Sequence, residues 1–191
     1  MQKKVNAVLG LAIIAALLVH IIYEIYAYMT FYYNPVLTKV IAFTVLGLGV
    51  LHIMLSVFIL FISHDKGKGL RYPALNIRIM LQRISAASIA IVLILHMNTF
   101  KILSGTANSN RVLFFAVLVI QVLFYLTVLF HIAVSAGNAF ITLGLITSDK
   151  ARKRIDIIVW ILCAILFAAA SFVVVRTQIG MFLTAGPGGA V

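Results

Sequence analysis

Five apolar segments, each long enough to cross a lipid bilayer, constrain this chain more than any other feature of its sequence. They cover roughly residues 5–28, 37–62, 80–101, 112–145 and 156–176. A transmembrane helix needs about 20 apolar residues to cross a hydrocarbon core roughly 30 Å thick. With 64% hydrophobic residues, the chain has more apolar surface than the exterior of a soluble domain accepts. The sequence therefore predicts an all-α fold, with residues 1–191 forming one integral membrane domain of five transmembrane helices.

The first segment begins like a secretory signal but is predicted to remain in the protein. Its apolar stretch is longer than the hydrophobic region of a signal peptide, and it contains Glu24. The single cysteine, Cys163, lies in the fifth segment. One cysteine excludes an internal disulfide and the Cys-x-x-Cys-His attachment of a c-type haem. We interpret Cys163 as a small buried apolar residue.

The basic residues are distributed unevenly between the two sides of the predicted bundle. The net charge of +11 would suit a nucleic-acid-binding protein, but these charges follow the ends of the apolar segments. With the amino terminus inside, eleven Lys and Arg residues lie on the inner side and four on the outer side. This positive-inside pattern predicts a cytoplasmic amino end and an outer carboxyl end. We expect lipid, and not nucleic acid, beside these charges; a basic cytoplasmic face could also dock soluble subunits.

Four histidines occupy the first four segments, one in each. His20 lies 16 residues after Lys4, and His96 lies 13 residues after Arg83, so both are roughly 20–24 Å from the inner boundary. The second and fourth segments run the other way. His52 follows Lys39 by 13 residues and His131 follows Arg111 by 20, roughly 20 and 30 Å from the outer boundary. The histidines therefore sort by depth into an outer pair, His20 with His96, and an inner pair, His52 with His131.

Two histidines at one depth on facing helices form the ligand arrangement of electron-transferring b haems. An apolar bundle suits a porphyrin, whose edges prefer apolar contact. The alternatives are four separate interhelical hydrogen bonds or a proton relay. A zinc or iron site made of protein ligands alone would need them in one coordination shell, which two depths forbid. The paired depths favour two haem b groups, with His20 and His96 on the outer iron and His52 and His131 on the inner iron.

Two further charged residues are candidates for the chemistry around such haems. Glu24 lies one helical turn after His20, near the outer boundary, where a carboxylate could accept a proton from a quinol. Its alternative role is that of an interfacial residue that reaches water or bonds a tyrosine. Arg83 lies at the inner start of the third segment, and its guanidinium could hold a haem propionate. Its alternative role is contact with lipid phosphate.

The sequence resembles the cytochrome b subunit of succinate dehydrogenases and fumarate reductases, in the single-subunit, five-helix, dihaem form. Two stretches carry the resemblance: Gln82-Arg83-Ile84-Ser85 with His96 and Thr99-Phe100-Lys101-Ile102, and Phe130-His131 with Asn138-Ala139-Phe140 and Arg152-Lys153-Arg154-Ile155. His20 and His52 stand at the positions of the first- and second-helix ligands. The similarity covers most of the chain and is strongest from residue 80 onward.

The resemblance implies a location, partners and an electron path. The chain would lie in a bacterial cytoplasmic membrane with a flavoprotein and an iron–sulfur subunit on its cytoplasmic face. Electrons would pass between the iron–sulfur cluster, the inner haem, the outer haem and a membrane quinone. Menaquinone is the quinone expected. Some members of the family use a glutamate two residues before the fourth-helix ligand in a transmembrane proton path. This chain has Leu129 there, so that path is not expected.

Two other functions stay open on the sequence alone. The chain could be the dihaem, quinone-reactive anchor of a different flavoprotein reductase or dehydrogenase. It could also be a haem-free membrane anchor or a transporter, although the sequence lacks the broken helices and repeated halves typical of transporters.

Overall fold

Five long helices make up the part of the chain that the computed structural model describes, residues 1–64, 77–106 and 110–184. They are α1 (Gln2–Thr30), α2 (Pro35–His64), α3 (Ile77–Thr106), α4 (Arg111–Thr142) and α5 (Asp149–Thr184). Each helix is long and apolar enough to cross a membrane. The prediction of an all-α fold with five helices that could each span a membrane is thereby confirmed. Three of the basic residues assigned to the inner side, Lys66, Lys68 and Arg71, lie outside the described ranges.

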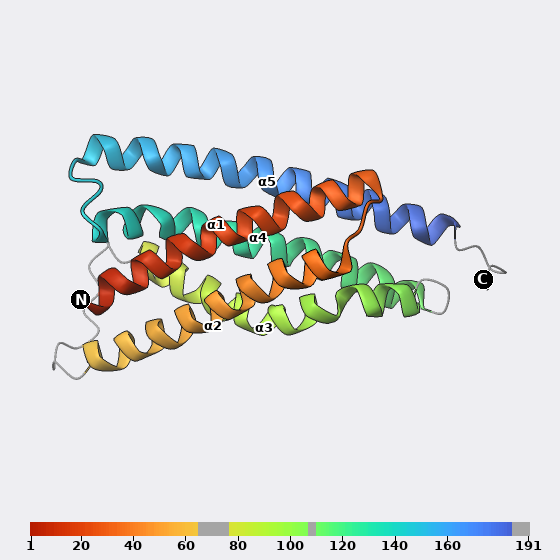
Figure 1. The fold of residues 1–191 in the computed structure, drawn as a ribbon, viewed down its shortest axis with the longest axis horizontal. Coiled ribbons are helices and arrows are strands. Elements are labelled where there is room, and N and C mark those ends of the chain that lie inside the picture. The colour runs from red at the N-terminus through yellow and green to blue at the C-terminus, as the bar shows by residue number, and fades with distance from the viewer. Residues whose placement is uncertain (65–76, 107–109, 185–191) are drawn as a thin grey trace.

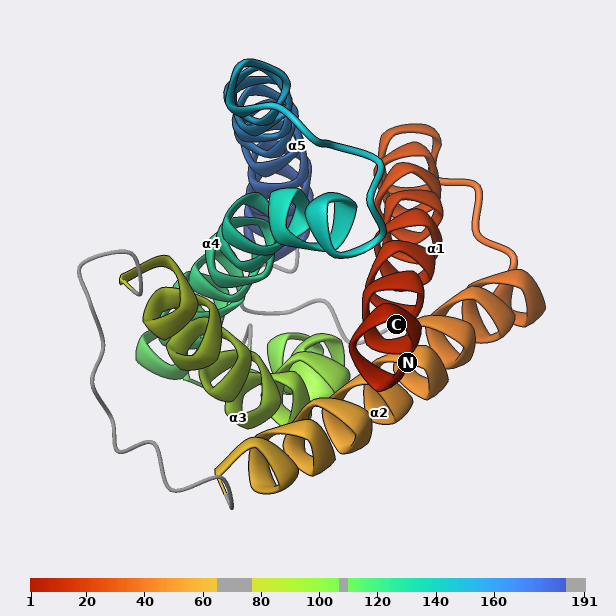
Figure 2. The same ribbon diagram turned by 90° about the vertical axis from the view of Figure 1, so that its left-hand side faces the viewer.

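The helices run up and down along one common direction (Figure 1). The near end of the bundle, as we name it, contains the starts of α1, α3 and α5, and the far end contains the starts of α2 and α4. Viewed from the near end, α1 to α4 surround a common interior and α5 packs outside them against α4 and α1 (Figure 2). Among the first four helices, α1 packs against α2 and α4, and α3 packs against α4. Consequently α1 faces α3, and α2 faces α4, across this four-helix ring.

The helix ends depart from the predicted segments: α4 stops short of its predicted end, and α5 extends beyond the predicted segment at both ends. The apolar run was expected to continue the fourth helix to residue 145, but α4 ends at Thr142. Gly144 adopts a left-handed backbone with φ 77°, and the amide of Leu145 donates to the carbonyl of Phe140 at 3.0 Å. This is the hydrogen-bond pattern that closes a helix after a left-handed glycine. Hydropathy alone does not register such a stop.

The fifth helix begins at Asp149, seven residues before the predicted position 156. The Ser148 hydroxyl accepts a hydrogen bond from the Ala151 amide at 3.2 Å, which caps the helix. Asp149 in the first turn also complements the helix dipole. A charged first turn therefore extends the helix beyond the apolar stretch that hydropathy detects.

The bundle has the polarity of a membrane protein, with apolar side chains outside and several polar ones inside. Large apolar residues are well exposed, among them Ile91 at 71% and Leu162 at 53%. In contrast, Thr99 and Gln121 are only 2% and 1% exposed. Lipid is the natural neighbour of such an exterior. Cys163 is buried in an apolar cluster between α4 and α5, as interpreted from the sequence.

Candidate functional site

The four histidines of the first four helices lie at two levels of the bundle. His20 lies ten residues before the end of α1 at Thr30, and His96 lies ten residues before the end of α3 at Thr106. Both are therefore roughly 15 Å from the far end.

The other two histidines lie towards the near end. His52 and His131 lie twelve and eleven residues before the ends of α2 and α4. They are thus roughly 17 Å from the near end. Since α1 to α3 are each roughly 44 Å long, the two levels lie roughly 12 Å apart along the helix axes.

Within each level, the two histidines are close enough to interact electrostatically. His20 interacts with His96, and His131 interacts with His52. Each pair joins helices that face one another across the ring, α1 with α3 and α2 with α4 (Figure 2). All four side chains are half-buried. The structure thus brings together the same pairs that the sequence places at common depths.

At the far level, His96 is held by a polar contact and by an aromatic ring. The amide nitrogen Nε2 of Gln121 lies 2.7 Å from Nδ1 of His96. The Gln121 oxygen lies 3.0 Å from the hydroxyl of Thr99, which also lies 2.9 Å from the Leu95 carbonyl. The imidazole stacks on Phe124 with ring centroids 4.6 Å apart. This surrounding shell fixes the ring plane of His96 against α4.

At the near level, His131 is held by a buried hydroxyl and His52 packs on a glycine. Nδ1 of His131 lies 2.9 Å from Oγ of Ser85, a side chain that is 4% exposed. A Cβ on Gly10 would lie 3.5 Å from Cε1 of His52, so the imidazole rests directly against the α1 backbone. The near pair is therefore positioned from α1 and α3 as well as from its own helices.

Two imidazole nitrogens in this interior have no hydrogen-bond partner among the described residues. They are Nδ1 of His20 and Nδ1 of His52, one in each pair. A buried polar atom without a partner costs roughly 1–3 kcal/mol, so the described side chains do not fully satisfy these two rings. The donor set would fit two b-type haems, because each such haem takes two imidazoles from the protein and each level offers two. Nowhere in residues 1–64, 77–106 and 110–184 do three or more His, Cys, Asp or Glu side chains converge as metal ligands.

Glu24 belongs to a polar cluster at the far end of α1. Its Oε1 is buried and has no hydrogen-bond partner within the described parts of the chain. The carboxylate interacts electrostatically with Tyr28 and with Tyr125 of α4. Tyr28 in turn interacts with Gln178 of α5, which is 6% exposed. The cluster therefore combines an unsatisfied acceptor with hydroxyl and amide groups, next to the level of His20 and His96.

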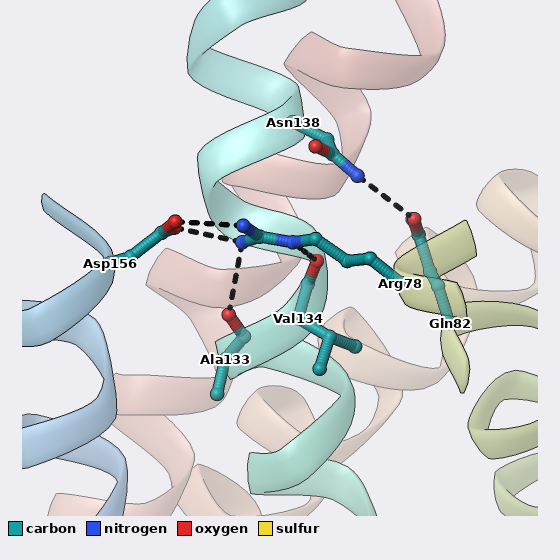
Figure 3. Close-up of polar contacts among 6 residues, drawn as sticks. All are labelled: Arg78, Gln82, Ala133, Val134, Asn138 and Asp156. Atoms are coloured by element: carbon teal, nitrogen blue, oxygen red, sulfur yellow. Dashed lines mark hydrogen bonds and ion pairs between the residues drawn. The ribbon is translucent and has the colours of Figure 1, made fainter. Parts of the chain in front are cut away.

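Arg83, the predicted propionate contact, has an exposed side chain on α3. A different arginine, Arg78, reaches across the near end (Figure 3). Its guanidinium forms a two-pronged ion pair with Asp156 of α5, with N–O distances of 2.7 and 2.8 Å. Its Nε donates to the carbonyl of Val134 at 2.7 Å. This pair connects α3, α4 and α5.

Sequence reasoning missed Gln121 and the Arg78–Asp156 pair, and it identified Ser85 only as part of a motif. A signal for each was available. Gln121 is a lone amide within a long apolar run, and such residues usually hydrogen-bond inside the bundle. Asp156 is one of four acidic residues in the chain, and it needs a partner near a membrane. The identity of that partner depends on helix rotation, which the sequence does not give.

No protein-family model, no curated protein and no solved structure matches this chain. The function proposed below therefore rests on the geometry of the site and on the residues that carry the resemblance to cytochrome b subunits.

Proposed function

We propose that this chain is the membrane-anchor dihaem cytochrome b subunit of a succinate:quinone oxidoreductase, a succinate dehydrogenase or fumarate reductase. In this role it binds two b-type haems and passes electrons between an iron–sulfur subunit and membrane quinone. The observation that carries the proposal is the pairing of four intramembrane histidines across facing helices at two levels. Ionisable side chains inside a membrane are costly and are usually retained for function.

The residues have distinct tasks in this proposal. His20 and His96 would hold the haem of the far level, and His52 and His131 that of the near level. Bound haem supplies reversible one-electron chemistry. The chain would supply the histidine ligands, a spacing of roughly 12 Å between the two levels along the helix axes, and a surrounding of low polarity. Phe124, stacked on His96, keeps one of these imidazoles fixed and keeps water away from it.

The orientation of the bundle follows from the same proposal and from the charge pattern. The near end would face the cytoplasm of a bacterial cell, because the inner side has most of the basic residues. A flavoprotein and an iron–sulfur subunit would dock there. His52 and His131 would then lie closer to the iron–sulfur cluster, and His20 and His96 closer to the outer surface.

Quinone would react beside the far level, where Glu24 lies. The Oε1 atom of Glu24 lacks a hydrogen-bond partner among the residues described, so it is available to accept a proton from a quinol hydroxyl as a general base. Tyr28 and Gln178 offer hydroxyl and amide groups for the quinone oxygens. The proton would leave towards the outer side, because Glu24 is only six residues from the end of α1.

The experiment that tests the proposal separates the two levels by mutation. Low-temperature reduced-minus-oxidised spectra are recorded for membranes of the wild type, His52→Ala and His96→Ala. We expect each variant to lose one of two b-type α-band components, and the lost component to differ between them. Asn98→Ala is the matched control, because Asn98 is an exposed neighbour of His96 that bonds only the Ile94 carbonyl of its own helix.

Two results would contradict the proposal. The absence of any b-type band in the wild type would leave the haem-free anchor or transporter. Loss of the same component in both histidine variants would break the assignment of pairs. The chain could also be the dihaem anchor of a different flavoprotein. Purifying the intact complex and testing it for oxidation of succinate distinguishes this function from the proposed one.

A further inference from the structure

Two polar side chains contact Nδ1 of the proposed haem ligands, and the direction of their hydrogen bonds determines whether these imidazoles can bind iron. A neutral imidazole has one N–H and one nitrogen lone pair, and the bond made by one nitrogen fixes the state of the other. A histidine that binds iron through Nε2 has its proton on Nδ1, where it donates to an acceptor. An acceptor at Nδ1 therefore selects the tautomer that can bind a metal.

Ser85 is such an acceptor for His131. The hydroxyl has a single proton, and the Leu81 carbonyl lies 2.7 Å from Oγ, with the Gln82 carbonyl at 3.1 Å. Since that proton is donated to the backbone of α3, only the lone pairs of Oγ face Nδ1 of His131 at 2.9 Å. In this arrangement His131 is the donor in the contact with Ser85. Its proton is on Nδ1, and the lone pair of Nε2 is left for iron.

Gln121 can act in the same way on His96. Turning its amide half a turn about the last side-chain bond exchanges oxygen and nitrogen with little change of shape. The oxygen then accepts from Nδ1–H of His96 over the same 2.7 Å. The nitrogen donates to Thr99, whose own proton goes to the Leu95 carbonyl 2.9 Å away. Each of these three contacts then pairs one donor with one acceptor.

We infer that Ser85 and Gln121 are positioning residues that hold His131 and His96 in the iron-binding tautomer, one at each level of the bundle. The inference rests on the proposed dihaem function and extends it. The opposite histidines, His20 and His52, have no hydrogen-bond partner at Nδ1 in the described ranges. Each level thus has one imidazole whose Nδ1 contacts a polar side chain and one whose Nδ1 has no such contact among the described residues. Both contacted rings belong to the hairpin of α3 and α4.

The consequence is measurable as a redox potential. A hydrogen bond from Nδ1–H to an acceptor makes the imidazole a better electron donor, which stabilises ferric haem and lowers its midpoint potential. Removing the acceptor should raise the potential of the haem on that level alone. Strengthening the acceptor should lower it.

The test is a spectroelectrochemical titration of both haems in the intact complex. We expect Ser85→Ala to raise the potential of the near-level haem only, and Gln121→Leu to raise that of the far-level haem only. Ser85→Thr, which keeps the hydroxyl, should restore the wild-type value. Gln121→Glu, with a stronger acceptor, should lower the far-level potential below that of the wild type. Loss of one haem, from the altered level alone, also supports the inference.

Two controls match these variants in size and position. Ser88→Ala removes a hydroxyl one turn away on α3 that, among the described residues, bonds the Ile84 carbonyl and no other group. Thr127→Val does the same on α4, where the hydroxyl bonds the Leu123 carbonyl. Both should leave the two potentials unchanged.

The inference is overturned if Ser85→Ala and Gln121→Leu leave the potentials unchanged, or if either variant shifts both haems alike. If Ser85→Ala or Gln121→Leu loses both haems, the variants that keep a polar group decide. A wild-type potential in Gln121→Glu overturns the inference for His96. Failure of Ser85→Thr to recover the near-level potential overturns it for His131. If the wild type contains two haems but these substitutions do not change their potentials, this inference fails and the proposed function stands. A wild-type protein without haem defeats the proposed function first.

Discussion

Gly137 shows how a single residue can decide the packing at the near end. A Cβ at this position would lie 2.5 Å from Oδ1 of Asp156 and 3.0 Å from Nη2 of Arg78. The absence of a side chain on α4 is therefore what lets the ion pair lie against the helix. It also brings the guanidinium within reach of the Val134 carbonyl.

Gly137→Ala should consequently destabilise the protein, although alanine is the better helix former. The added methyl group must displace the ion pair, and overpacking of this kind costs about 1–3 kcal/mol. Thermal unfolding in detergent, followed by circular dichroism, measures the effect. Gly47→Ala is the control, because a Cβ there meets no heavy atom within 4 Å outside its own helix in the described parts of the chain. Equal unfolding temperatures for the two variants would contradict the packing described.

Glu24→Gln tests the proposed proton acceptor. Glutamine keeps the size of the side chain but cannot take up a proton at neutral pH. We expect quinol turnover by the intact complex to fall at least about tenfold, with the haem spectrum unchanged. Tyr26→Phe, an exposed change in the same helix, should keep full turnover. Unchanged turnover in Glu24→Gln would remove the carboxylate from the quinone reaction.

At this scale the sequence predicted positions better than contacts. The four histidines are recognisable because polar groups are rare in apolar segments, and counting residues places them in depth. The partners Ser85 and Gln121 depend on how each helix is rotated about its axis. Rotation follows from packing against neighbouring helices, and all five segments are too uniformly apolar for their pattern to specify it. The partner of Arg78 could not be predicted for the same reason.

At the scale of helices, the apolar cores of all five were predictable and their ends were not. A bilayer selects for a stretch of apolar residues, whereas a helix ends where its terminal amides and carbonyls find partners. Asn34 illustrates this, because its side chain accepts from the amides of Val36 and Leu37, both at 3.1 Å. With Pro35 in the first turn, this cap begins α2 two residues earlier than hydropathy indicates.

The ion pair between α3 and α5 makes a prediction about helix association. Arg78→Gln and Asp156→Asn should each lower the free energy of unfolding by about 2 kcal/mol, because each leaves a half-buried charge without its partner. The double variant should cost less than the sum of the two. Unfolding in detergent with increasing denaturant supplies the three values. Arg154→Gln, an exposed change close to Asp156 on α5, is the control, and strict additivity would show that the pair is not coupled.

At the scale of the whole molecule, the charge pattern predicts how the bundle lies in the membrane. In a Cys163→Ser background, Tyr33→Cys places a thiol in the exposed turn between α1 and α2, and Thr147→Cys places one between α4 and α5. A membrane-impermeant maleimide should label the first in intact cells and the second only after permeabilisation. The positive-inside distribution is the reason. The reverse labelling would invert the proposed orientation.

The arrangement of the whole bundle determines whether histidines at equal depths lie on facing helices. Histidines at equal depths can meet only if their helices face one another, and the ring of α1 to α4 satisfies this for both pairs (Figure 2). Depth came from sequence position, but the order of helices around the ring came from the structure. If α5 lay between α1 and α3, His20 and His96 could not pair even though they lie at the same depth.

The most direct test of this account is the haem content of the purified protein. The spectrum of the pyridine complex of the bound haem gives the haem type. Together with the protein concentration, it gives the number of haems per chain. The account predicts two b-type haems per polypeptide, and one in either His52→Ala or His96→Ala. A wild-type value of one or none would contradict it.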